Sequence, residues 1–435
     1  MEKLKNFYLK YKMALVLSLS TTLLFLSGFF DPLWIVAAAL VIVCYTSFNF
    51  GEIFASICYF SVLSNFGLFY IVILLGAFAV IAVKYIVDVC LKKRKFFAVP
   101  FVLTTLFVAV FSCFHYNYNT IGLENGVLVL ALLYVIYFVF VYKDQVDVHE
   151  CFRFIVMAIV ISGAFGSITL LFDGYAYSIF HNDGMYKRLQ LFCFQQNHLA
   201  MICTFVIAYY IYKFLNKQLR HRIAVPVIVV CVIAGILTLS KAFIVMCVGF
   251  VGYLFIYYVV KYRRRSFKII LCVVAGLALM SLLFRGFVKD VFERFLAYNT
   301  TNSFINRITT GRSKIWYEYI EAITSSIPKM LFGHGIFNAE LISIGAHNVL
   351  LFFAYRTGLI GLIILGLIAF SYAKASETKC EFKYKKLLPL LTFIILSFNE
   401  MIFSDRFFMY LILAILLLLP KKQTSVKETE NKDNE

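Results

Sequence analysis

The stretch IFASICYFSVLSNFGLFYIVILLGAFAVIAVKYIV, residues 53–87, is apolar almost throughout, and the basic cluster Lys92–Lys95 follows it closely. A helix needs about 20 residues to cross a bilayer, and short basic loops stay on the cytoplasmic side. The N-terminal lysines, up to Lys12, and the Lys92–Lys95 cluster therefore belong on the same side. That parity requires residues 53–87 to cross the membrane twice, with a short first helix.

Apolar runs alternate with basic clusters along the whole chain. Hydrophobic residues make up 62% of the 435 positions and charged residues 15%, whereas a soluble domain is about half apolar and about a quarter charged. No N-terminal run has a signal-peptide cleavage site, so the first run is expected to remain as a helix. The segments expected to cross are 13–30, 33–49, two within 53–87, 97–114, 127–141, 154–172, 191–214, 225–239, 243–260, 269–287, 349–370, 387–403 and 407–419. We predict an all-α fold, a polytopic transmembrane bundle of about 12–14 helices.

Charge and cysteine placement exclude other classes of protein. The formal net charge of +18 resides in clusters between apolar runs, so it sets topology and does not indicate nucleic-acid binding. The 11 cysteines form no CxxC pair, which argues against a zinc site or a disulfide framework. Residues 1–420 are expected to form one membrane domain with external loops at 173–188 and 285–346. Residues 421–435 are expected to be a disordered cytoplasmic tail, with both termini inside.

Three groups of polar residues are expected at the external side, where polar groups near membrane depth are usually functional. They are Arg188 with Gln195 and Asn197, then Arg312 with Trp316, and finally His334, His347 and Asn348. Two arginine guanidinium groups at one site suit a diphosphate. His347 lies at an expected helix N-terminus, where the helix dipole favours a neutral imidazole that can accept a proton. Trp316 offers a flat face for a sugar ring.

Each of these residues also has a plain structural explanation. Arg188 can bind lipid headgroups, and Trp316 can anchor a helix at the membrane interface. His334 lies between two glycines and suits a turn, while Gln195 and Asn197 can join helices through hydrogen bonds. His347 can be a helix cap. Glu400 is an intramembrane acid that either orients His347, acts as the base itself, or belongs to a surface ion pair.

From Arg188 onward, the order of short motifs resembles that of the O-antigen ligase and polymerase superfamily. The motifs are R-x6-QQNHLA (188–200), SKA (240–242), TGRSKIW (310–316), LFGHGIF (331–337) and AHNVLL with RTGLIGL (346–362). The resemblance implies a GT-C-like fold and action on glycans carried by undecaprenyl diphosphate at the outer face of the bacterial cytoplasmic membrane. It implies no metal or nucleotide-sugar cofactor. Lys241 stands where arginine is frequent, and no glycine precedes the Gln-Asn pair.

The resemblance assigns roles to residues of this chain. Arg188 and Arg312 would bind the diphosphate, and His347 would deprotonate or orient the acceptor hydroxyl. The residues expected to bind substrate are Trp316, Asn197, Gln195, His334, Asn348, Lys241 and Glu400. The expected function is polymerisation of lipid-linked repeat units into a capsule or exopolysaccharide, with membrane lipids, a flippase and a chain-length regulator as partners. The alternatives are a ligase with another acceptor and, from a different class, a flippase for lipid-linked oligosaccharides.

Overall fold

The fold is seen in a computed structural model of the 435-residue chain. It describes residues 2–66, 68–94, 96–113, 133–172, 175–183, 186–193, 195–261, 285–286, 312–336 and 348–375, with isolated residues 388, 391, 392, 413, 416 and 417. The described part is mostly helical, as the sequence predicts. A single two-stranded hairpin is the exception within these residues.

In the described part of the chain, seven α-helical segments and one short 3-10 helix precede the hairpin. They are α1 (Glu2–Ser27), α2 (Leu33–Tyr45), α3 (Phe50–Ser61), α4 (Phe69–Cys90), α5 (Ala98–Cys113), a helical segment at 133–141, and α7 (Val148–Thr169), which follows the short 3-10 helix η1 (Lys143–Gln145). Local chemistry sets several of the ends. Asn49 and Glu52 form a reciprocal capping box at the start of α3. Asp147 accepts a hydrogen bond from the backbone N–H of His149 at the start of α7.

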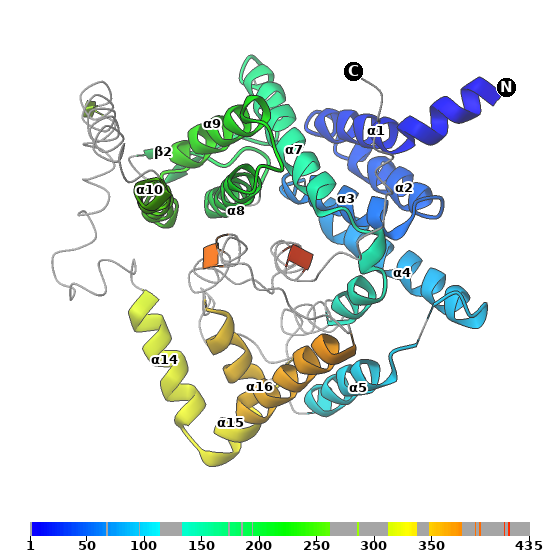
Figure 1. The fold of residues 1–435 in the computed structure, drawn as a ribbon, viewed down its shortest axis with the longest axis vertical. Coiled ribbons are helices and arrows are strands. Elements are labelled where there is room, and N and C mark those ends of the chain that lie inside the picture. The colour runs from blue at the N-terminus through cyan, green and yellow to red at the C-terminus, as the bar shows by residue number, and fades with distance from the viewer. Residues whose placement is uncertain are drawn as a thin grey trace, which may run out of the picture.

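The second group contains the hairpin and the remaining helices. The strands are β1 (Phe180–Asp183) and β2 (Tyr186–Leu189), which are antiparallel, with His181 opposite Arg188. The helices are α8 (Gln196–Leu215), α9 (His221–Leu237), α10 (Lys241–Lys261), α14 (Arg312–Thr324), α15 (Ile327–Phe332) and α16 (Val349–Ala375). In Figure 1, α7–α10 lie on one side of the molecule and α1–α4 beside them, with α5 and α14–α16 along the lower edge.

One end of the bundle collects basic side chains, and we call it the basic end. Lys12 of α1 forms an ion pair with Glu52 of α3 at 2.8 Å. Arg94, after α4, forms an ion pair with Asp144 at 2.9 Å. The neighbouring Gln145 side chain accepts a hydrogen bond from the backbone N–H of Phe50. These contacts place the start of α3, the end of α4 and the segment before α7 together.

The other end of the bundle, which we call the hairpin end, holds the termini of the same helices. The Tyr175 hydroxyl donates to the Phe25 carbonyl at 3.0 Å, near the end of α1. The backbone N–H of Asn65, after α3, donates to the Phe192 carbonyl at 2.8 Å. Because α3 begins at the basic end and finishes here, α3 and α4 run in opposite directions. This geometry agrees with the two antiparallel segments that the sequence predicts between residues 53 and 87.

The outer surface of the helices is apolar. Among the residues that the structure describes, five helices are long and apolar enough to cross a membrane: Phe69–Cys90, Val148–Thr169, Gln196–Leu215, Lys241–Tyr258 and Val349–Tyr372. Side chains such as Leu19, Val83, Val248 and Ile363 are more than half exposed. An exposed apolar surface of this kind is typical of a membrane protein. The expected count of 12–14 spanning helices concerns the whole chain and stays a prediction.

The helix α8 is the most deeply buried of these long helices. In the most apolar stretch of α8, 83% of the residues are buried, against 17% in α10 and 33% in α4. It packs mainly against α9, and also against α10. A helix that is apolar all round and enclosed by others forms the centre of its group. The first residues of α8 therefore belong to a helix that is held in place by its neighbours.

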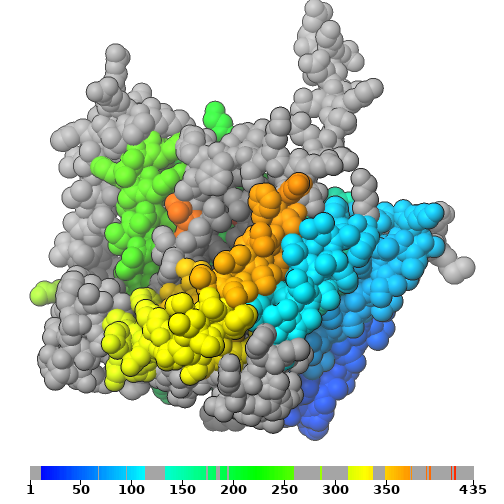
Figure 2. Space-filling view, turned by 90° about the horizontal axis from the view of Figure 1, so that it is seen from below, coloured from blue at the N-terminus to red at the C-terminus, as the bar shows by residue number. Residues whose placement is uncertain are grey.

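The helices α14, α15 and α16 pack together, and α16 joins them to the rest of the bundle. Both α14 and α15 pack against α16, and α16 packs against α5. Figure 2 shows α14 and α15 beside α16, and α16 beside α5. The ring of Tyr372, near the end of α16, lies 5.0 Å from the ring of Phe140. Phe140 precedes η1 at the basic end, so α16 finishes at that end.

Candidate functional site

Arg188 is the central residue of the first predicted group. It lies on β2, and only 5% of its surface is exposed. Its Nε donates to the Thr238 carbonyl at 2.8 Å, and its Nη2 donates to the Asn197 Oδ1 at 3.1 Å. Thr238 is the C-cap of α9, and Asn197 lies in the first turn of α8. The guanidinium therefore joins the hairpin to two helix ends, in a fixed orientation.

Two helix N-termini flank this arginine. Gln195 is the N-cap of α8, but its side chain makes no capping hydrogen bond. Lys241 is the first residue of α10, and the Ser240 N–H before it donates to the Thr238 Oγ1 at 3.2 Å. Neither helix has an acidic residue in its first turn. The positive end of a helix dipole disfavours cations, by about 0.3–1 kcal/mol for an exposed group. Lys241 and Arg188 beside two such ends create a region that favours an anion.

For Asn197 and Gln195 the sequence left two interpretations, substrate binding and hydrogen bonding between helices, and the structure treats the two residues differently. Asn197 accepts from Arg188, so it orients the guanidinium and also links the hairpin to α8. The exposed side chain of Gln195 remains accessible at the start of α8. Both lie at the hairpin end, together with Arg188 and Lys241. The structure thus brings together four of the predicted site residues.

The second group of predicted residues belongs to the α14–α16 unit. The Tyr319 ring of α14 lies edge-on to the Tyr355 ring of α16, with centroids 5.1 Å apart. The His334 ring stacks on the same Tyr355 ring, with the two ring centroids 4.3 Å apart. The backbone N–H of His334 donates to the Tyr355 carbonyl at 2.8 Å, and the ring Nδ1 lies 3.2 Å from the same oxygen. His334 is 7% exposed.

The environment of His334 fixes its protonation. A carbonyl oxygen only accepts, so the hydrogen bond at 3.2 Å places the ring proton on Nδ1 and leaves Nε2 as an acceptor. Burial lowers the pKa of His334 below its usual value, against the opposing effect of the Tyr355 carbonyl. A neutral ring stacked on Tyr355 agrees with the turn interpretation of this residue, and its Nε2 keeps the capacity to bind a donor.

The loop that carries His334 fits against a kink in α16. Gly358 has φ 61° and ψ −168°, so α16 consists of two helical pieces. Gly333 and Gly335 also have positive φ, at 73° and 103°. A Cβ on Gly333 would lie 2.5 Å from backbone atoms of Arg356 and Thr357. Glycine is required where two backbones approach this closely. Two motifs far apart in the sequence, LFGHG and RTG, therefore form one structural unit.

Arg356 is a residue that sequence reasoning missed. It is 2% exposed, its Nη1 donates to the Ile336 carbonyl, and its guanidinium lies 4.6 Å from the centre of the Phe352 ring. The signal was present in the sequence, because an arginine within the apolar run VLLFFAYRTGLIGL is costly at membrane depth. Arg356 ties the His334 loop to α16.

Asn348 has a clear structural role. Its Oδ1 accepts from the backbone N–H groups of Leu350 at 3.0 Å and Leu351 at 3.2 Å. It is therefore the N-cap of α16. Arg312 is the first residue of α14, and Trp316 follows one turn later on the same face. His347 and Glu400 lie outside the described residues. The prediction that Arg188, Arg312 and His347 share one cavity stays a prediction.

Two cavities lie at the basic end, away from the hairpin end. One of 610 Å³ lies between the α8–α9 turn and the end of α10. The other, of 270 Å³, is lined by residues that include Phe50, Lys84, Asp88 and Tyr142. In the second cavity the Lys84 ammonium donates to the carbonyls of Tyr45, the last residue of α2, and of Phe48, in the turn after it. That lysine is explained by helix capping.

Comparison with known proteins adds no family to this description. No protein-family model matches the chain, and no curated protein matches it in sequence.

Proposed function

We propose that this chain is a membrane polysaccharide polymerase, which joins oligosaccharide repeat units carried on undecaprenyl diphosphate. The observation that supports this most directly is the Arg188 region at the hairpin end. A buried guanidinium, an adjacent lysine and two helix N-termini favour the binding of an anion. A diphosphate at a membrane surface is an anion of that kind.

Rigid placement of Arg188 suits stabilisation of a leaving group. In the transfer, an acceptor sugar hydroxyl attacks the anomeric carbon of the donor, and the bond from that carbon to the diphosphate oxygen breaks. Negative charge develops on the diphosphate, which leaves as undecaprenyl diphosphate. Donors that are already oriented stabilise such charge without reorganisation. The Arg188 guanidinium is oriented by the Thr238 carbonyl and the Asn197 amide.

The hydroxyl proton requires a base, and His347 is the residue we assign to it. In the sequence it directly precedes Asn348, the N-cap of α16. The positive end of the α16 dipole disfavours imidazolium next to it, which keeps a histidine in its proton-accepting form. Arg312 is the second diphosphate ligand in this proposal.

Reconstitution in liposomes tests the function. Purified protein is supplied with a defined undecaprenyl-diphosphate repeat unit, and products are resolved by size. A ladder of chains, each longer by one repeat unit, is expected from wild type. Arg312→Ala and His347→Ala are expected to remain in the membrane and yield no ladder. Transport of the lipid-linked unit across the bilayer without any change in chain length would refute polymerisation and favour a flippase.

A further inference from the structure

The cavity of 610 Å³ at the basic end has no role in the proposed polymerisation. It lies between the turn that joins α8 to α9 and the last turns of α10. Its size falls within the range of about 300–1,000 Å³ that is usual for small-molecule sites. Nine described residues line it: Phe214, Leu215, Lys217, Leu219, Arg220, His221, Arg222, Tyr257 and Tyr258.

The lining is strongly cationic. Lys217, Arg220 and Arg222 are all exposed, and none of the nine described lining residues is acidic. His221 adds a fourth nitrogen-bearing side chain, and Tyr257 and Tyr258 add two hydroxyl groups. Arginine and lysine side chains together suit phosphate oxygens, with arginine providing a planar fork of donors. The chemistry of the cavity thus selects an anion that carries phosphate.

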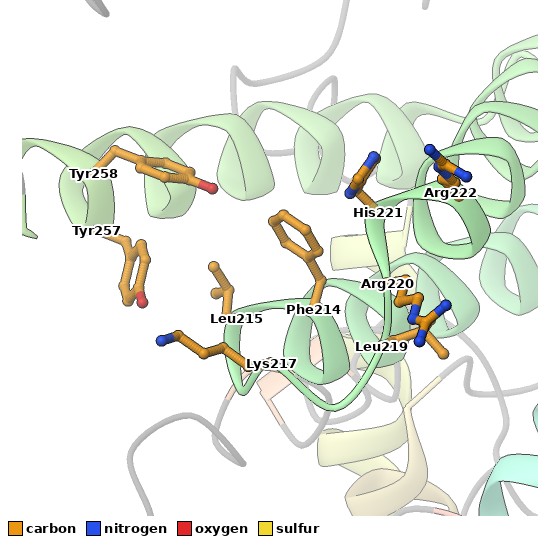
Figure 3. A pocket seen from close by; sticks show the side chains of 9 residues that line it. All are labelled: Phe214, Leu215, Lys217, Leu219, Arg220, His221, Arg222, Tyr257 and Tyr258. Atoms are coloured by element: carbon orange, nitrogen blue, oxygen red, sulfur yellow. The ribbon is translucent and has the colours of Figure 1, made fainter. Parts of the chain in front are cut away.

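The arrangement of the cations favours one type of phosphate compound. Figure 3 shows Lys217 and Tyr257 on one side of the cavity, Arg220 and Arg222 on the other, and Phe214 and Leu215 between them. The apolar side chains between the two cationic sides add nothing to the affinity for inorganic phosphate. They add to the affinity for a phospholipid, because its headgroup contacts the cations while its acyl chains cover apolar surface.

The backbone of the turn holds this cationic edge in place. Lys217 has φ 57° and directly follows the C-cap of α8, a position where a left-handed residue ends a helix. Four residues later α9 begins, with Arg220 as its N-cap and no side-chain capping bond. The turn between two long helices therefore presents Lys217, Arg220 and Arg222 within a short, defined segment.

We infer that this cavity binds the headgroup of an anionic phospholipid at the membrane surface of the basic end. The lipid would bridge the α8–α9 turn and α10, two parts of the bundle that come together at this edge. Bound there, it would stabilise the end of α10 against the buried helix α8. The inference concerns a different site from the polymerase proposal, and each can fail without the other.

Lipid binding to the purified, full-length protein tests the inference. The protein in neutral detergent is titrated with phosphatidylglycerol, and bound lipids are counted by native mass spectrometry. Phosphatidylcholine with the same acyl chains, whose zwitterionic headgroup has no net charge, is the comparison, and inorganic phosphate is added as a competitor. We expect wild type to retain phosphatidylglycerol in preference to phosphatidylcholine. Inorganic phosphate at millimolar concentration is expected not to displace it.

The variant Lys217→Gln/Arg222→Gln removes two charges from the cavity. Since each basic residue near an anionic headgroup contributes about fivefold in affinity, the loss of two such residues is expected to weaken binding by roughly 25-fold. The matched control is Lys92→Gln/Lys93→Gln, which removes two exposed charges at the same end, outside the cavity. This control is expected to bind phosphatidylglycerol as wild type does. Arg220→Gln provides a second, single-site variant if the double variant fails to fold.

Three results would overturn the inference. The first is an equal affinity of wild type for the two lipids. The second is an equal loss in the cavity variant and the control, which would show that the charge of the whole end attracts the lipid. The third is displacement of phosphatidylglycerol by inorganic phosphate, which would identify a site for a soluble anion.

Discussion

Replacement of Gly358 by alanine tests whether the kink in α16 holds the His334 loop. A Cβ at this position would lie 2.4 Å from the Leu331 carbonyl atoms and 2.6 Å from the Gly333 nitrogen. The ordinary contact distance begins at 3.4 Å, so the loop must retreat by about 1 Å. The conformation of φ 61° and ψ −168° is also nearly exclusive to glycine, at a cost of about 1–3 kcal/mol for alanine.

The retreat weakens two backbone hydrogen bonds that join the loop to α16. These are His334 N–H to the Tyr355 carbonyl at 2.8 Å and Gly335 N–H to the Arg356 carbonyl at 2.9 Å. Each bond contributes about 0.5–1.5 kcal/mol to stability. Together with the backbone strain of about 1–3 kcal/mol, the loss of both bonds lowers stability by roughly 2–6 kcal/mol. The matched control is Gly366→Ala in the same helix, where a Cβ meets nothing within 4 Å. That change is expected to stabilise α16 by about 0.5–1 kcal/mol.

Thermal unfolding in detergent measures the effect. Both variants are heated at one scan rate and followed by intrinsic fluorescence, because unfolding of such proteins is often irreversible and depends on the rate. The expected result is a clearly lower Tm for Gly358→Ala and an unchanged or higher Tm for Gly366→Ala. Equal Tm values for the two variants would show that the loop does not depend on the kink.

Substitutions at three further residues separate structural from functional roles. Arg188→Lys keeps the charge but loses the planar group that donates to both Thr238 and Asn197. Polymer synthesis is therefore expected to stop, and stability to fall by about 1–3 kcal/mol. Full activity of this variant would contradict a role for a positioned guanidinium. Asn348→Ala is expected to cost about 1 kcal/mol in thermal stability, and Asn348→Asp to restore it; an equal loss in both would show that the amide NH2 is needed beyond capping. Because burial lowers the pKa of His334, the folded protein holds it neutral and loses stability as the pH falls below about 6.5, whereas the unfolded chain takes up the proton. His334→Phe keeps the stack on Tyr355, and its Tm is expected to depend less on pH between 5 and 7; an unchanged pH dependence would exclude the histidine as its source.

Much of the helix order follows from apolar runs and the residues that interrupt them. The turn at Asp31-Pro32 lies where the sequence predicts it, whereas α10 begins at Lys241, two residues before the predicted start at Phe243. The start of α7 was predicted at Phe154, but the helix begins at Val148. Asp147 caps it there, and the polar first turn at the basic end carried no apolar signal. Similarly, α8 begins at Gln196 instead of Leu191, whose φ is 50°.

The hairpin was predicted only as an external loop at 173–188. The pair Asp183-Gly184 is a common hairpin signal and could have identified it. The partner of Arg188, by contrast, could not be predicted, since the Thr238 contact is made by a backbone carbonyl and leaves no trace in the side chain. The Gly358 kink could not be predicted either, because its cause is the close approach of residues 331–333, which lie outside α16.

Binding of undecaprenyl diphosphate to the Arg188 region is the most direct test of the account. The dissociation constants of undecaprenyl diphosphate and undecaprenyl monophosphate are measured for wild type, Lys241→Gln and Lys213→Gln. Lys213 is the matched control, because it lies at the other end of α8, where its ammonium is 5.8 Å from the centre of the Tyr209 ring.

Wild type is expected to bind the diphosphate more tightly than the monophosphate. Lys241→Gln is expected to lose about tenfold for the diphosphate, equivalent to about 1.4 kcal/mol, while Lys213→Gln binds as wild type does. Equal affinity of wild type for the two lipids, or an unchanged affinity in Lys241→Gln, would contradict a diphosphate site at the hairpin end.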